Sequence, residues 1–206
     1  MSARSVIHWS GAACILGGLC IAAFVLIHPW DQLVGAAIAR TTPWRLAHLF
    51  HFIGAAFALI GVTGLYANAR ERLGTLGTAG FVLAFLGNAM FLGTGMITAF
   101  IWPMLAQHAP STDELDGPIF HTATSATAFL LTAALMIVGY VLFGLALIRA
   151  QAYPRPALIA LIVGAILGML PPHPATAFPW GGLVLGGVLY AIALAWLGAI
   201  LWRENA

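Results

Sequence analysis

Six long apolar runs alternate with short polar segments along the chain. They cover residues 6–28, 46–67, 76–102, 121–148, 157–170 and 180–202, and charged residues or prolines separate them. A bilayer core about 30 Å thick needs roughly 20 apolar residues in a helix. The pattern therefore predicts an all-α, single-domain membrane bundle of six transmembrane helices.

The fifth run, residues 157–170, is the shortest. As an α-helix it would rise only about 21 Å, which is less than a full crossing. Either the helix starts nearer Tyr153, since proline is tolerated in a first helical turn, or the run is re-entrant and only five spans are complete. We favour six spans because the arginine distribution then agrees with one orientation.

The arginines divide unevenly between the two sides of such a bundle. With the N-terminus inside, the cytoplasmic side carries Arg4, Arg70, Arg72, Arg149, Arg155 and Arg203, and the outer side carries only Arg40 and Arg45. An excess of positive residues in cytoplasmic loops is the usual pattern of membrane proteins. The sequence thus predicts that both termini are cytoplasmic.

Composition excludes several classes of protein. Hydrophobic residues make up 62% of the chain and charged residues 7%, with a mean hydropathy of +0.98. In a soluble domain about a quarter of the residues are charged, which is far more than in this chain, so we expect the protein to lie in a lipid bilayer. The net charge of +2 gives no support for a nucleic-acid partner. The chain has no lysine, which excludes Schiff-base chemistry and a P-loop lysine.

Tryptophans cluster near the ends of the predicted spans. Trp30, Trp44, Trp102 and Trp180 fall at the outer ends, and the other three fall near the inner ends. Because amphipathic rings prefer the membrane interface, we interpret them as interfacial anchors rather than as parts of a binding site.

Small residues at helical spacing indicate close helix packing. Gly164 and Gly168 are four residues apart, as are Gly182 and Gly186. This spacing would serve contacts within the bundle, with a membrane-protein partner subunit or in a homo-oligomer, and it does not distinguish them. Asn88 is the one amide deep in a predicted span, and we expect it to bond to a neighbouring helix.

Residues 139–168 carry a resemblance. The stretch from Phe143 to Arg149, followed by Tyr153-Pro154-Arg155 and another apolar run, resembles a segment of an uncharacterised family of six-span bacterial integral membrane proteins, filed as a domain of unknown function. The resemblance implies a six-helix fold and a place in the cytoplasmic (inner) membrane of a bacterium. It carries over no catalytic residue.

The histidines are the residues with candidate chemistry. His48 and His51 are three apart and share a helix face, and His121 opens a span whose Thr124, Ser125, Ala128 and Thr132 continue one polar stripe. Imidazoles on facing helices can hold a haem b, which makes His48, His51 and His121 candidate cofactor ligands. With His28 and His173 at the same depth, a transition-metal site is the second possibility. The alternative is that these histidines are solvated or cap backbone carbonyls at the interface.

Three functional hypotheses follow. The favoured one is a non-catalytic accessory or structural subunit of a membrane assembly. The alternative is a redox subunit that binds haem b or a metal through the outer histidines, and the third is a small-molecule or lipid permease. No catalytic residue is assigned, because the sequence has no nucleophile elbow and no acid within a predicted span.

Overall fold

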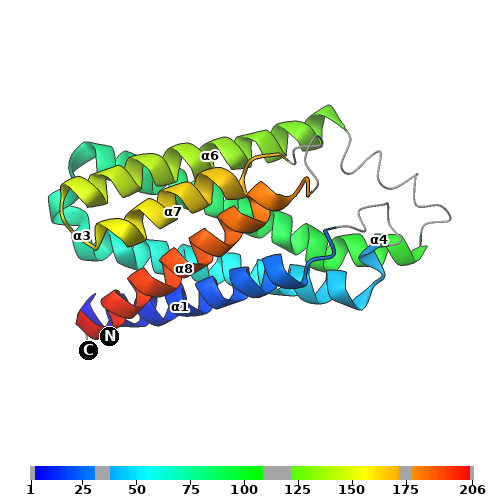
Figure 1. Ribbon diagram of the computed structural model, residues 1–206, viewed down its shortest axis with the longest axis horizontal. Helices are drawn as coiled ribbons and strands as arrows, with labels where there is room; N and C mark the ends of the chain where they lie inside the picture. The colour runs from blue at the N-terminus through cyan, green and yellow to red at the C-terminus, as the bar shows by residue number, and fades with distance from the viewer. Residues whose placement is uncertain (1–2, 31–37, 109–121, 172–177, 205–206) are drawn as a thin grey trace.

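The computed structural model describes residues 3–30, 38–108, 122–171 and 178–204 of the chain (Figure 1). Over these residues it is helical and has no strand, so the prediction of an all-helical fold is confirmed for them. The elements are α1 (Ala3–Ile27), α3 (Thr42–Met96), the π-helix η1 (Ile97–Ile101), α4 (Trp102–His108), α6 (Ala123–Arg149), α7 (Arg155–Gly168) and α8 (Gly181–Glu204).

Helix α3 is a hairpin of two antiparallel arms that reverses at Gly74. The reversal has φ 58° and ψ −166°, a backbone region open essentially to glycine alone. Contacts between the arms follow the antiparallel order: Tyr66 stacks on Phe81, and His51 lies against Phe91. The sequence pattern predicted a loop over residues 68–75, whereas the helix continues to Gly74 before it turns. A single glycine replaces a longer polar loop.

The helices lie along the long axis of the molecule, and both described ends of the chain meet at one end of it (Figure 1). His8 of α1 and the backbone carbonyl of Trp202 in α8 are hydrogen-bonded there at 3.0 Å. The reversal at Gly74 and the α6–α7 turn lie at the same end. Because these segments carry Arg4, Arg70, Arg72, Arg149, Arg155 and Arg203, we call this the arginine end and the opposite one the histidine end.

Four helical stretches are long and apolar enough to cross a membrane: α1, the continuous stretch Thr42–His108, α6 and α8. Helix α7 is also apolar but has only 14 residues. Its bounds, Arg155–Gly168, differ from the predicted 157–170, because Pro156 sits in the first turn and the helix ends before Pro171.

Glycines bring α7 and α8 into backbone contact. A Cβ on Gly164 would lie 2.5 Å from the backbone nitrogen of Tyr190, and one on Gly186 would overlap the backbone of Gly168. Such close approach increases van der Waals contact between the helices. In a bilayer this contact holds helices together, because lipid tails are as apolar as the helix surfaces and the hydrophobic effect does not favour association. Gly182 differs from the other three, since nothing lies within 4 Å of the position of its missing Cβ.

A buried polar cluster joins three helices near the middle of the bundle. Asn88 of α3 donates from Nδ2 to the Tyr140 hydroxyl of α6 at 2.7 Å and to the backbone carbonyl of Ala84 at 2.8 Å. Tyr190 of α8 donates to Asn88 Oδ1 at 3.2 Å, and the Tyr140 and Tyr190 hydroxyls are bonded to each other. We call Asn88, Tyr140 and Tyr190 the polar lock.

Candidate functional site

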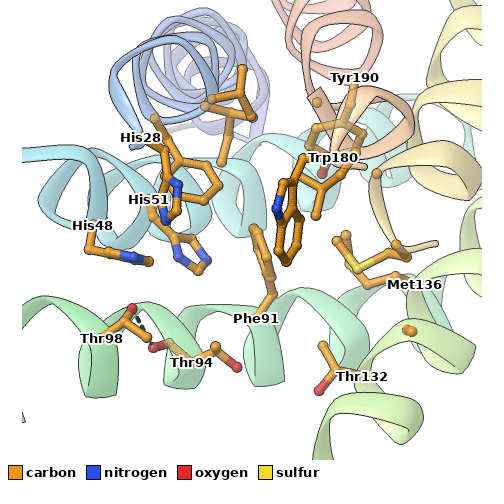
Figure 2. Close-up of a pocket in the computed structure, with 18 of the residues that line it drawn as sticks. His28, His48, His51, Phe91, Thr94, Thr98, Thr132, Met136, Trp180 and Tyr190 are labelled. Atoms are coloured by element: carbon orange, nitrogen blue, oxygen red, sulfur yellow. Dashed lines mark hydrogen bonds between the residues drawn. The ribbon is translucent and has the colours of Figure 1, made fainter. Parts of the chain in front are cut away.

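A cavity of about 540 Å³ lies inside the histidine end (Figure 2). Residues of α1, both arms of α3, η1, α4, α6, α7 and α8 contribute to its wall, so no single helix pair forms it. The described lining residues include no Asp, Glu, Lys or Arg. The cavity is within the size range of small-molecule sites and its wall is mostly apolar.

Three histidines share one side of the cavity. His28 follows the last turn of α1, and His48 and His51 lie in the first turns of α3. All three are buried, and the ring centroids of His28 and His48 are 5.1 Å apart, those of His48 and His51 5.9 Å apart. The helical spacing of His48 and His51 accounts for their shared face, but only packing of α1 against α3 adds His28.

The imidazole nitrogens in this cluster lack partners. Both nitrogens of His48, both of His51 and Nδ1 of His28 are buried and make no hydrogen bond with the residues that the structure describes. The Phe91 backbone faces the His51 ring, but no nitrogen of that ring reaches it with hydrogen-bond geometry. A buried polar group without a partner costs about 1–3 kcal/mol, so five such atoms beside one cavity call for an explanation.

Several other polar side chains of the wall have already used their donors. The hydroxyls of Thr94, Thr98 and Thr132 each donate to the backbone carbonyl four residues earlier in the chain. The indole of Trp30 donates to the Val25 carbonyl at 2.8 Å. These groups have no further hydrogen to offer, in contrast to the N–H groups of His48 and His51.

The π-helix and Pro103 explain the bond of the Trp44 indole. In η1 the Trp102 N–H bonds to the carbonyl of Ile97, five residues back. In the same register the Thr98 carbonyl would need the N–H of residue 103, which is proline and has none. Trp44 Nε1 donates to this carbonyl at 3.2 Å and so ties the start of α3 to η1.

The four outer tryptophans all line the cavity, and the burial of Trp44 and Trp102 corrects the interpretation of these two as interfacial anchors. Trp102 is 1% exposed and Trp44 is 6% exposed, and Trp30 and Trp180 pack against each other with ring centroids 5.5 Å apart. Sequence position gives the depth of a side chain in a bundle but not the direction in which its helix face points. The spacing Trp44, His48, His51 on one face was the available signal for a binding wall.

The polar stripe predicted on α6 divides in the structure. Thr132 is buried and lines the cavity, whereas Thr124 and Ala128 are exposed. Ser125 bonds to Thr122, whose side chain caps the start of α6 by accepting from the Ser125 N–H at 3.2 Å. The start of α6 therefore contributes a helix cap, and the part of α6 that lines the cavity begins at Phe129.

His121 and His173 lie outside the described residues, so the predicted haem pair of His121 with His48 or His51 has no described geometry. Within residues 3–30, 38–108, 122–171 and 178–204, no group of three His, Cys, Asp or Glu side chains is arranged to hold a metal ion. The described part of the site is thus a set of neutral hydrogen-bonding groups around an apolar cavity.

Comparison with known proteins gave no match to a protein-family model, to a curated protein or to a solved structure. The resemblance of residues 139–168 to a six-span bacterial family stays a prediction.

Proposed function

We propose that this protein is an integral membrane protein that binds a neutral amphiphilic small molecule in the cavity at its histidine end. The observation that carries the proposal is the set of five unpaired imidazole nitrogens beside a cavity of about 540 Å³. A ligand with a polar group at this wall would remove their desolvation cost, and the apolar remainder of the ligand would meet the apolar remainder of the wall.

The topology proposed with it has six crossings, with the two arms of α3 as the second and third. The arginine end faces the cytoplasm and the histidine end faces outward, in the inner membrane of a bacterium. Support comes from the six arginines that gather with both described chain ends at one end of the bundle. In this orientation the cavity lies in the outer half of the membrane.

The ligand is neutral because the described wall of the cavity has no charged group to pair with a charge. No acidic or basic side chain occurs among its described lining residues, and burial of an unpaired charge is costly. This argues against the headgroups of charged phospholipids. It also argues against haem b, which carries two carboxylates.

A second feature separates the site from a haem or metal centre. Imidazoles that bind a metal almost always donate their other N–H to a carbonyl, a carboxylate or water. Among the described residues, no acceptor of this kind meets hydrogen-bond geometry with His48 or His51. Their arrangement favours hydrogen bonding to a ligand over coordination.

A role as an accessory or structural subunit is compatible with ligand binding but does not explain the cavity. Packing alone is served by the polar lock, in which every amide and hydroxyl hydrogen has an acceptor. The histidine cluster is the opposite case, since five of its nitrogens have no partner among the described residues. We therefore assign the histidine end to binding and the middle of the bundle to structure.

The test is to extract the protein directly from membranes into polymer nanodiscs and to identify small molecules in the purified particle by native mass spectrometry. We expect an equimolar neutral molecule in the wild type. Ala133→Trp, which fills the cavity from α6, should abolish binding of this molecule. The control is Leu130→Trp on the same helix, which should leave binding unchanged because the Leu130 side chain is 71% exposed. Absence of an equimolar molecule from the wild type, or equal amounts in wild type and Ala133→Trp, would contradict the proposal.

A further inference from the structure

We infer that the molecule bound in this cavity is a lipid-soluble quinol, held in its reduced form more tightly than the corresponding quinone. The inference rests on the proposed function and specifies the ligand class of the same site. It follows from the shape of the wall, from the hydrogen-bond capacity of its two sides and from its lack of charge.

Aromatic side chains surround the cavity. Phe24 stacks on His51 with ring centroids 4.8 Å apart, and Trp44 lies 4.2 Å from His48 by the same measure. The other aromatic rings of the wall include Trp30, Phe91, Trp102, Phe129 and Trp180. Flat side chains in this number favour a planar aromatic ligand, which gains from stacked or edge-to-face contacts on several sides.

The histidine side of the cavity can both donate and accept. A neutral imidazole has one N–H and one unprotonated nitrogen, and both nitrogens of His48 and of His51 are unpaired. This side can donate to a quinone carbonyl or accept from a quinol hydroxyl. By itself it does not select between the two redox states.

The opposite side of the cavity offers acceptors. Figure 2 shows Thr132, Met136 and Tyr190 across the cavity from the three histidines. The Thr132 hydroxyl already donates to the Ala128 carbonyl at 2.8 Å, and the Tyr190 hydroxyl donates to Asn88. The Met136 thioether is only a weak acceptor.

Asn88 makes this assignment of hydrogens unique. Its Nδ2 can only donate and its Oδ1 can only accept, so the polar lock runs from Asn88 to Tyr140, from Tyr140 to Tyr190 and back to Asn88. Tyr190 therefore keeps one lone pair for a ligand but no hydrogen. A quinol has a hydroxyl at each edge of its ring, so one hydroxyl can donate to Thr132 or Tyr190. A quinone has only carbonyl acceptors, which would lie against the hydroxyl acceptors of this side without a hydrogen between them.

The experiment titrates nanodisc-reconstituted protein with a short-tail benzoquinol under anaerobic reducing conditions and, separately, with the matched benzoquinone. Binding is followed by quenching of the fluorescence of the four cavity tryptophans. We expect the quinol to bind about five- to tenfold more tightly, which is the effect of about one hydrogen bond.

Variants distinguish the two sides of the cavity. Thr132→Val should weaken quinol binding about fivefold and leave quinone binding unchanged, because it removes an acceptor at nearly constant volume. His48→Leu should weaken both ligands, and His48→Gln, which keeps a donor and an acceptor, should restore part of the affinity. His108→Leu is the matched control, since His108 is exposed and does not line the cavity.

Four results would overturn the inference. Quinone binding as tight as quinol binding would remove the preference for the reduced form, and a Soret band in the purified protein would identify haem instead. If neither ring compound binds while the nanodisc particle carries another equimolar neutral lipid, the quinol assignment is wrong and the proposed function stands. If neither binds and the particle carries no small molecule, both fail.

Discussion

Asn88 sets the direction of every hydrogen bond in the polar lock. Its two amide hydrogens go to Ala84 and Tyr140, and its oxygen accepts from Tyr190. All three side chains are at most 5% exposed, so none of these bonds is replaced by water when it is lost. One amide thereby fixes α6 and α8 against the second arm of α3.

We predict that Asn88→Leu lowers the free energy of unfolding by about 1–2 kcal/mol, because the Tyr190 hydroxyl loses its acceptor in an apolar interior. Tyr140→Phe should have a similar effect. Reversible unfolding in mixed detergent micelles measures both. Tyr66→Phe is the control, since the Tyr66 hydroxyl bonds to Thr78 in an exposed position and its loss should cost only a few tenths of a kcal/mol. Equal stability of Asn88→Leu and the wild type would refute a structural role for the lock.

At the scale of single elements, the reversal of α3 depends on one backbone conformation. Gly74 has φ 58° and has nothing within 4 Å of the position of a Cβ, so space does not limit a substitution there. The restriction lies in the dihedral angles alone. The hairpin in turn places His48 and His51 opposite Phe91, Thr94 and Thr98, which makes this glycine a distant determinant of the cavity.

The prediction is that Gly74→Ala and Gly93→Ala change stability in opposite directions. Gly93 also has open space around a Cβ but lies within the helical part of α3, where alanine is favoured over glycine by about 0.5–1 kcal/mol. Gly74→Ala should destabilise by about 1–3 kcal/mol because alanine rarely adopts its dihedral angles. The same unfolding assay compares them, and destabilisation of similar size in both variants would show that the reversal is not a backbone effect.

At the scale of the whole molecule, the two ends of the bundle differ in character. The arginine end carries most of the cations, and the histidine end holds the cavity and the cluster of tryptophans around it. A membrane that fixes the cations on its cytoplasmic side would present the cavity toward the opposite face.

Cysteine labelling tests this orientation in a chain whose Cys14 and Cys20 are replaced by alanine. Thr75 and His108 are exposed at the two ends of the bundle. In intact bacterial cells an impermeant thiol reagent should label His108→Cys and should reach Thr75→Cys only after the membrane is permeabilised. Labelling of Thr75→Cys alone in intact cells would show that the orientation is opposite to the one proposed. Labelling of both variants in intact cells would contradict the proposal that each arm of α3 crosses the membrane.

The apolar runs and their polar boundaries were readable from the sequence, because the hydropathy of a helix and its end signals are properties of neighbouring residues. The shared face of His48 and His51 was readable for the same reason, as helical spacing fixes it. The single-glycine turn at Gly74 was missed, since the polar residues around it are typical of a loop.

Only the tertiary structure decided which faces meet. It brought His28 beside His48 and turned Trp44 and Trp102 inward. It also joined Asn88 to tyrosines more than fifty residues away in the chain. These contacts depend on how the glycine-rich faces of distant helices pack, and no local pattern encodes that packing. The sequence alone thus determined the helices and the two chemically different ends, and the packing of the helices determined that one end encloses a cavity.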